Sequence, residues 1–401
     1  MAIDYYVFQA IAMITRDLSD TWRSSLRIAF WIPTGLSIAA LFWWAFDDPY
    51  RYSANVRNWI ITGLVATYFS KLFAVVILFA GDVQRGGKWL LSFLNKGAAG
   101  DLPGQAIPRS EFISQAALIA ASVPMGAFAY GIISGAHDYR VRRLTVKLRN
   151  LPKAFDGLSI GQISDIHAGS FWNKTAVKGG IELMMKEKPD MIFFTGDLVN
   201  NESTEVNDYV SVFEKLKAPF GVYSITGNHD YGDYKSWNSA EEKQNNFTNL
   251  VHAHKVMGYD ILMNENRMVE QGGEKIAILG IENWGAGRFS KYGQMDKAYK
   301  GTEGAAVKLL LSHDPSHWDA QVRKDYRDID VAFAGHTHGF QFGVEIGSFK
   351  WSPSQYAYKQ WAGLYQEEDQ YLYVNRGFGY IGYPGRVGIP PELTIVELKR
   401  A

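Results

Sequence analysis

Apolar and polar residues follow two different patterns along this chain, and the first pattern fills its first third. Residues 28–46 and 112–133 contain no charged side chain, and residues 59–80 contain only Lys71. A helix needs about 20 apolar residues to cross the hydrocarbon core of a bilayer. The pattern therefore predicts a membrane anchor over residues 1–133 with three transmembrane helices, the alternative being buried core helices of a soluble protein. Lys71 would either line a polar pathway or face a partner helix.

The rest of the chain has short apolar runs that end in polar residues. A basic linker, residues 134–143, leads into this region, which we expect to form one domain over residues 144–401. The runs are residues 160–163, 191–195, 222–226, 309–312 and 331–334. Short apolar runs between turn residues are typical of strands buried on both faces of a sheet. The pattern therefore predicts an α/β domain, in which ligands gather outside the carboxyl ends of the strands.

Each of these runs is followed by side chains that bind metal ions. They are Asp165 with His167, Asp197, Asn228, His313, and His336 with His338. Residues i and i+2 of an extended segment point to the same face, so one cation can bind both Asp165 and His167. Oxygen ligands combined with imidazole nitrogens suit Mn, Fe or Zn better than Ca or Mg alone. A single Asp after a strand is more often a helix cap, but the whole set predicts one shared metal site.

Composition narrows the classes of protein and partner. The 401 residues carry no net charge, but residues 1–143 hold 13 basic and 9 acidic side chains, and the remainder holds 28 and 32. An acidic second part argues against nucleic acid as a partner, and no protein partner is predicted. The chain has no cysteine, which excludes disulfides, thiolate metal sites and cysteine nucleophiles.

The order of the polar motifs resembles that of the calcineurin-like metallophosphoesterase superfamily. The family pattern is D-x-H, G-D, G-N-H-[DE], H and G-H-x-H, and the match runs from about residue 144 to residue 398. Asp230 stands where many members have Glu. The ending, residues 373–377 and 390–393, is similar to the membrane-anchored bacterial branch. The resemblance implies a four-layer α/β/β/α sandwich, preceded here by the membrane anchor.

The resemblance also implies the site and its chemistry. Two divalent metal ions are expected, Mn first, with Fe or Zn as alternatives. One ion would be held by Asp165, His167, Asp197 and His338, and the other by Asp197, Asn228, His313 and His336, with Asp197 bridging. The catalytic residues would be Asp197 and His229. A metal-activated hydroxide would attack phosphorus, while His229 binds the phosphate or protonates the leaving oxygen.

Two loops between the motifs are candidates for selecting the substrate. Residues 281–295 contain Trp284 and Arg288, and residues 339–365 contain eight aromatic residues, Trp351 among them. They predict an aromatic rim that receives an acyl chain or touches the bilayer, with Arg288 or Arg376 meeting a phosphate. The alternative is a small satellite core beneath long loops.

Together these features predict a membrane-anchored metallophosphoesterase. Its substrate would be a phosphoester, and more specifically a phosphodiester, of a lipid or another membrane-associated molecule. One alternative is a pyrophosphatase of a nucleotide-diphosphate lipid precursor such as a UDP-acylglucosamine. The others are a receptor or scaffold that keeps the fold without turnover, and a transporter regulated by its soluble domain.

The orientation in the membrane is less constrained by the sequence. With three spans, seven basic residues fall on each side, so the positive-inside rule does not decide. Residues 108–112 resemble a degenerate twin-arginine export signal. We therefore expect a multi-pass protein of the cell membrane whose catalytic domain lies outside the cytoplasm.

Overall fold

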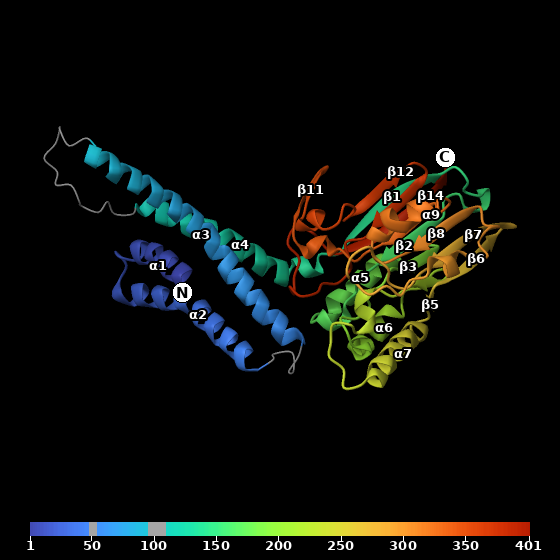
Figure 1. The fold of residues 1–401 in the computed structure, drawn as a ribbon, viewed down its shortest axis with the longest axis horizontal. Coiled ribbons are helices and arrows are strands. Elements are labelled where there is room, and N and C mark those ends of the chain that lie inside the picture. Colours follow the sequence, from blue (N-terminus) through green and yellow to red (C-terminus); the bar gives the residue numbers. More distant parts are fainter. Residues whose placement is uncertain (48–53, 95–109) are drawn as a thin grey trace. The chain divides into compact units, whose positions relative to one another are not determined.

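The chain divides into two compact units, which are shown in Figure 1. The computed structural model describes residues 1–47, 54–94 and 110–401. Met1–Tyr130 form the first unit, here called the helical unit, and Gly131–Ala401 form the second, here called the α/β unit. Arg109, on which the comparison with an export signal depends, lies outside the described residues.

The helical unit is built from apolar helices. They are α1 (Ala2–Ile14), α2 (Asp20–Phe46), α3 (Ala54–Leu94) and α4 (Glu111–Ile133), the last of which ends within the α/β unit. Three helical stretches, Asp20–Phe46, Val56–Leu91 and Glu111–His137, are long and apolar enough to cross a membrane. Each of them contains one of the three apolar segments predicted from the sequence.

Lys71 is buried inside the helical unit, where it connects three helices. Its Nζ lies 2.6 Å from the Asp4 carboxylate of α1 and donates to Thr34 Oγ1 of α2 at 2.9 Å. Nearby, Ala10 and Ala74 pack against each other's helices in the buried cluster of this unit, and such small residues let helix backbones approach closely. Of the two interpretations of Lys71, the structure thus favours the one in which it faces partner helices.

The α/β unit contains two six-stranded sheets and a separate hairpin. Its strands are β1 (Arg140–Leu148), β2 (Ser159–Ile163), β3 (Met191–Phe194), β4 (Val222–Ser224), β5 (Asp260–Ile261), β6 (Glu265–Gln271), β7 (Glu274–Gly280), β8 (Val307–Leu311), β9 (Val331–Ala334), β10 (Val344–Ile346), β11 (Phe349–Trp351), β12 (Gly363–Glu367), β13 (Gln370–Val374) and β14 (Glu392–Arg400). The first sheet has the order β1-β14-β2-β3-β4-β5 and the second β12-β13-β9-β8-β7-β6, while β10 and β11 pair only with each other.

Helices cover the outer faces of the two sheets. They are α5 (Lys174–Lys186), α6 (Val210–Phe213) and α7 (Ala240–Val256) on the first sheet. On the second they are α8 (Met295–Tyr299) and the helical turn Trp318–Val322, which continues into α9 (Arg323–Asp325). Asn173 and Ser239 cap the amino ends of α5 and α7 by accepting a backbone N–H. The result is the four-layer α/β/β/α sandwich, which confirms the predicted fold.

The apolar runs of the sequence are strands buried on both faces. In β3, Met191 and Phe193 belong to the core between the two sheets, whereas Ile192 and Phe194 belong to the core beneath the helices. Successive side chains of a strand point to opposite faces, so a strand between two cores needs apolar residues at every position. This explains why the sequence shows continuous apolar runs instead of an alternating pattern.

Candidate metal centre

The predicted metal-binding side chains all lie in loops that follow strands, and the strands come from both sheets. Asp165 and His167 follow β2, Asp197 follows β3, Asn228 follows β4, His313 follows β8, and His336 and His338 follow β9. Strands β2, β3 and β4 run parallel in the first sheet, and β8 and β9 run parallel in the second. Their carboxyl ends therefore deliver these side chains to one place.

The backbone at these positions is strained. Five of the ten described non-glycine residues with a positive φ belong to the predicted ligand set: Asp165, His167, Asp197, His336 and His338, with φ between 50° and 70°. A left-handed conformation costs an ordinary residue roughly 1–2 kcal/mol. Strain of this kind persists where the surrounding structure holds it and is concentrated at functional sites. The turn after β2 brings Asp165 and His167 to one cluster, and the turn after β9 sends His336 and His338 to two neighbouring clusters.

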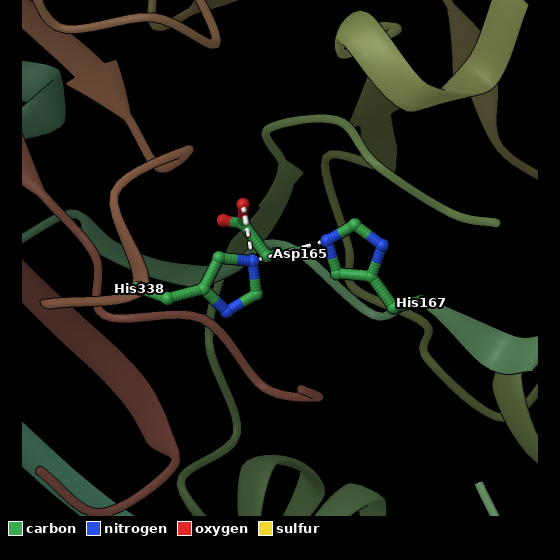
Figure 2. A group of neighbouring side chains, drawn as sticks. All are labelled: Asp165, His167 and His338. Atoms are coloured by element: carbon green, nitrogen blue, oxygen red, sulfur yellow. Dashed lines mark hydrogen bonds and ion pairs between the residues drawn. The ribbon is translucent and has the colours of Figure 1, made fainter. Parts of the chain in front are cut away.

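Asp165, His167 and His338 form a first buried cluster, and their side chains converge in Figure 2. His338 Nε2 lies 3.0 Å from His167 Nε2 and 3.3 Å from Asp165 Oδ1. The Asp165 carboxylate also accepts the backbone N–H of His336 at 2.9 and 3.1 Å. Two imidazole nitrogens and a carboxylate oxygen that face one point form a donor set that fits a divalent cation.

Asp197, His313 and His336 form a second cluster beside the first. His313 Nε2 lies 3.2 Å from Asp197 Oδ2 and 3.3 Å from His336 Nδ1. The side-chain oxygen of Asn228 lies 2.8 Å from the same His336 nitrogen. This cluster therefore offers two nitrogen and two oxygen donors, which also fit a divalent cation.

The Asp197 carboxylate lies between the two clusters. Its Oδ2 is 3.2 Å from His313 Nε2 of the second cluster and 3.5 Å from His167 Nε2 of the first. Its Oδ1 accepts the backbone N–H of His229 at 2.9 Å. One carboxylate can thus serve two cations while it fixes the loop that carries His229.

Hydrogen bonds orient three of the imidazole rings. His313 Nδ1 donates to the Thr195 carbonyl at 2.7 Å, so Nε2, the nitrogen that faces Asp197, is the one that can give up its proton to bind a metal. His336 Nε2 lies 2.6 Å from the Tyr358 hydroxyl, so its Nδ1 faces the cluster. His229 Nδ1 lies 2.9 Å from the Asn200 carbonyl, and this contact fixes the orientation of the ring.

Burial sets the protonation states of the site. It lowers the pKa of His167 to about 3 and the pKa of His336 to about 4, so both rings are neutral near pH 7 and keep a lone pair for a metal. Burial likewise raises the pKa of Asp165 to about 7. At His313, burial acts to lower the pKa, but the Asp197 carboxylate outweighs it and raises the pKa to about 10. A cation that binds there must displace this proton, so metal binding and deprotonation are linked.

Comparisons with known proteins agree with this geometry. Residues 158–340 match the family described as "Calcineurin-like phosphoesterase", and residues 1–136 match "Probable Calcineurin-like phosphoesterase, transmembrane domain". The metallophosphoesterase YkuE of Bacillus subtilis is 30% identical over 278 residues, which cover 68% of this chain and 90% of YkuE. The chain belongs to the calcineurin-like phosphoesterase family. It is a metal-dependent phosphoric ester hydrolase with helices that can span a membrane.

Other similar proteins are more distant or longer. The "Transmembrane protein with metallophosphoesterase domain" of Danio rerio is 28% identical over 282 residues, and the match covers 68% of this chain and 60% of that protein. Among solved structures, the sulfate thiohydrolase SoxB of Thermus thermophilus superimposes with a TM-score of 0.36 at 11% identity, over 62% of this chain and 57% of that one.

The structure corrects the prediction that Arg376 meets the substrate. Arg376 is 4% exposed, and its guanidinium binds Glu392 at 2.6 Å and Glu345 at 2.7 Å. Glu392 is itself completely buried. Because both sides of the guanidinium are occupied by carboxylates, Arg376 connects elements of the metallophosphoesterase and does not bind a phosphate.

The other predicted substrate contacts have different surroundings. Trp284 is half-buried against the core beneath the second sheet, with its ring 4.7 Å from that of His317 and Lys291 Nζ 4.6 Å from its ring centre. Trp351 lies on β11, and Arg288 is exposed in the loop whose next residue, Phe289, packs 4.9 Å from the His336 ring. Substrate contacts by Arg288, Trp284 and Trp351 stay predictions.

Sequence reasoning missed three residues that support the metal centre. Asp230 accepts backbone N–H groups of Asp197 at 2.9 Å and of Gly227 at 2.8 Å, and its place after His229 in the G-N-H-D motif was the available signal. Tyr358 contacts His336, as described above. Arg386 is 1% exposed and donates to the Gly377 carbonyl at 3.1 Å, with its Nη2 3.3 Å from His338 Nδ1. No local pattern predicts the contact between Arg386 and the metal centre, because His338 lies 48 residues away in the sequence.

Proposed function

We propose that this metallophosphoesterase hydrolyses a phosphodiester in a lipid of the membrane that holds it. The observation that carries the proposal is the pair of donor clusters with the Asp197 carboxylate between them, in a chain with three helices able to cross a bilayer. We assign Asp165, His167, Asp197 and His338 to one metal ion and Asp197, Asn228, His313 and His336 to the other. Mn²⁺ is the expected metal, since the nitrogen and oxygen donors suit it.

Asp197 and His229 have different roles in the proposed reaction. When bound, two divalent ions activate water and stabilise the charge on the phosphoryl oxygens. Asp197 holds the two halves of the site together and positions His229 through that residue's backbone N–H. His229 is only half-buried, and the Asn200 carbonyl fixes its ring, so its Nε2 is in place to protonate the leaving oxygen. A positioned histidine typically contributes about 10²–10⁴-fold to the rate.

Aromatic side chains at the edge of the site support a diester as the substrate. The Tyr234 ring lies 4.6 Å from that of His229, and the Phe289 ring lies 4.9 Å from that of His336. Tyr234 also accepts the Asn228 side-chain amide at 2.9 Å, so its ring is held beside the metal centre. An aromatic edge suits a phosphate with two organic substituents and one negative charge better than a doubly charged monoester.

The membrane helices support a lipid as the source of that diester. An enzyme fixed to a bilayer meets lipid headgroups at high local concentration, because its encounter with them no longer depends on diffusion from solution. We place the protein in the cell membrane with the α/β unit outside the cytoplasm. A reporter fused after Ala401 that is active only outside the cytoplasm tests this orientation, and activity only inside would contradict it and favour a cytoplasmic precursor as substrate.

The test of catalysis uses the full-length protein in detergent with added Mn²⁺ and a chromogenic phosphodiester. We expect hydrolysis that needs the metal and falls at least about 100-fold in both Asp197→Asn and His229→Ala. His229→Ala should still bind the metal, and the matched control His252→Ala, at an exposed histidine outside the site, should behave as wild type. Absence of bound metal in the wild type would overturn the proposal. If the metal-dependent hydrolysis is observed, a panel of phospholipids in nanodiscs tests the lipid assignment.

A further inference from the structure

The hairpin formed by β10 and β11 exposes its apolar face and turns its charged pair toward the protein, whereas a surface hairpin ordinarily buries its apolar face. Val344 pairs with Trp351, Glu345 with Lys350, and Ile346 with Phe349. Side chains alternate between the two faces of a strand, so the two apolar pairs lie on one face and the charged pair lies on the other. The apolar face is the one that points outward: Ile346 is 72% exposed and Phe349 is 60% exposed.

The charged face of the hairpin is fixed to the body of the α/β unit. Glu345 forms ion pairs with Arg142 of β1 and with the buried Arg376, at 2.7 Å in the second case. Lys350 donates to the Ala362 carbonyl at 2.6 Å, and its ammonium lies 5.4 Å from the Trp361 ring centre. The hairpin therefore cannot turn over to bury its apolar face without breaking these bonds, one of which involves a buried arginine.

Exposed apolar side chains are concentrated in this part of the α/β unit, every residue of which the structure describes. Eleven large apolar or aromatic side chains of the unit are exposed, and five of them fall within residues 340–356. These five are Phe340, Val344, Ile346, Phe349 and Tyr356. A contiguous exposed apolar patch on a folded protein marks a surface that binds a partner or a membrane.

The base of the hairpin is bonded to the chain segment that touches the end of a membrane-crossing helix. Gly131, in the apolar helix Glu111–His137, accepts the backbone N–H of Arg386 at 3.1 Å. The next residue, Val387, donates to the Gln341 carbonyl at 2.8 Å and accepts the Gly343 N–H at 2.9 Å, immediately before β10. Ile133, in the last turn of the helix, is 73% exposed. Hydrogen bonds through Arg386 and Val387 thus connect the start of the hairpin to the last turns of this helix.

The chain segment that precedes the hairpin begins at the metal centre. His338, Gly339, Phe340 and Gln341 are four consecutive residues with φ between 50° and 57°, and β10 begins at Val344. Figure 1 shows β11 at the end of the α/β unit opposite to β6 and β7. A metal ligand and the exposed apolar hairpin are therefore joined by one short, conformationally restricted segment.

We propose that the outer face of this hairpin, formed by Val344, Ile346, Phe349 and Trp351, inserts into the interfacial region of the lipid bilayer. The occupant is the bilayer because the hairpin is bonded to a segment that contacts the end of a membrane-crossing helix. Aromatic and aliphatic side chains together are the set that enters the boundary between headgroups and acyl chains. The insertion holds the metal centre at the level of the headgroups. It goes beyond the proposed function and does not depend on it.

The absence of cysteine from the chain makes the insertion directly measurable. Phe349→Cys and, as the matched control, Val256→Cys at the exposed end of α7 (Val256 is 52% exposed) each accept a single nitroxide label. The full-length protein is placed as one copy per nanodisc of phosphatidylcholine and phosphatidylglycerol. We expect dissolved oxygen to accelerate the spin relaxation of the label at position 349 more than a water-soluble nickel chelate does. The label at position 256 should show the reverse.

Two results of this measurement would overturn the proposal. One is equal access of the nickel chelate to positions 349 and 256, which would leave the hairpin in water. The other is protection of position 349 only in nanodiscs that contain two copies, which would make the occupant a second copy of this chain.

A kinetic comparison adds the consequence for catalysis and rests on the proposed function. In Ile346→Ser and Phe349→Ser, hydrolysis of a lipid phosphodiester in the same bilayer should fall roughly tenfold, since each substitution removes apolar surface from the membrane contact. Hydrolysis of a soluble chromogenic diester should be unchanged, as should both activities in Val256→Ser. An equal loss with both substrates would show a purely structural role and contradict the proposal. If the wild type hydrolyses no lipid, the proposed substrate is wrong, and the nitroxide measurement still decides the insertion.

Discussion

At the scale of single residues, Asp230 is the side chain on which the order of the metal centre most depends. Its two oxygens accept backbone N–H groups of Asp197, Leu198, Val199 and Gly227 at 2.8–3.3 Å. It thereby joins the loop after β3 to the loop after β4. A carboxylate can accept four such bonds, whereas an amide would turn an NH₂ group toward two of the donors.

We therefore expect Asp230→Asn to weaken Mn²⁺ binding and activity by about 10–100-fold, the usual cost of losing a group that orients metal ligands. Metal content per chain and kcat/KM measure the effect. Asp230→Glu keeps both oxygens and is the control that should retain most of the metal and the activity. If Asp230→Asn bound metal as well as the wild type, the four backbone bonds would have no part in ordering the ligands.

His254 provides a pH-dependent contribution to stability that is separate from the metal centre. It is completely buried in α7, with Nδ1 3.0 Å from Ser224 Oγ, and burial lowers its pKa from 6.5 to about 3. Between these two values the unfolded chain binds a proton and the folded chain does not, so stability falls as the pH is lowered through that range. The contribution of neutral His254 to the free energy of unfolding is fully present above pH 6.5.

The prediction is a falling melting temperature for the metal-free protein between pH 6.5 and pH 4, with a smaller fall in His254→Gln, which cannot titrate. Scanning fluorimetry in detergent at several pH values measures it. His252→Gln changes an exposed histidine of the same helix and should follow the wild type. Identical slopes for all three proteins would mean that His254 is protonated as readily in the folded as in the unfolded chain.

The sequence was informative about the residues whose neighbours in the chain share their function. Asp165 and His167 are two residues apart and belong to the same cluster, so spacing alone predicted that they converge. His336 and His338 are equally close in sequence but belong to different clusters, which spacing did not show. Arg376 was misassigned because its partners, Glu345 and Glu392, lie 31 and 16 residues away and no local pattern shows them. A surface arginine and a buried one have the same appearance in a sequence.

At the scale of secondary-structure elements, the ends of the strands need glycine where two loops approach closely. Gly335, between β9 and His336, lies against Asp165 and Ser164, and a Cβ at this position would collide with Asp165 Oδ2 and Ser164 Oγ. The Asp165 carboxylate would then have to move away from His338.

We expect Gly335→Ala to lose metal from the first cluster and to reduce activity by about 100-fold, since displacement of a catalytic group by about 1 Å has that effect. Metal analysis and kcat on the chromogenic diester test this. Gly179→Ala in α5, where a Cβ meets nothing within 4 Å, is the matched control and should leave activity unchanged. Normal metal content in Gly335→Ala would show that the loop adjusts without moving Asp165.

The elements themselves were predicted to different degrees. Continuous apolar runs identified β2, β3, β4, β8 and β9, because a strand between two cores is apolar at every position. The β10–β11 hairpin was interpreted only as part of an aromatic loop, since neither the pairing of Val344 with Trp351 nor the inward turn of Glu345 can be derived from local spacing. Contacts to other parts of the sheet determine which face of such a hairpin is outermost.

At the scale of the whole molecule, stability and metal binding are linked. The metal centre buries the carboxylates of Asp165 and Asp197, which follow strands of the first sheet, together with imidazoles that follow strands of both sheets. A ligand that binds only the folded state stabilises it by about 2.7 kcal/mol at a concentration 100 times its Kd. Removal of the metal should therefore loosen the connection between the two sheets.

We expect removal of the metal by a chelator to lower the melting temperature of the wild type by roughly 5–10 °C, with recovery on addition of Mn²⁺. Asp197→Asn, which lacks the shared carboxylate, should show a much smaller response to either treatment. A melting temperature of the wild type that did not change with metal would contradict this linkage.

The position of β14 has a consequence for the synthesis of the protein. β14 lies between β1 and β2, pairing with β1 along Arg140–Leu148 and with β2 along Ser159–Gln162. A ribosome makes residues 392–400 long after both neighbouring strands, so the first sheet cannot close during most of translation. The helical unit is already made by then and can enter the membrane first. The first sheet of the α/β unit can therefore be completed only once residues 392–400 have been made, and a chain released before residue 392 leaves two strands of this sheet without the strand that joins them.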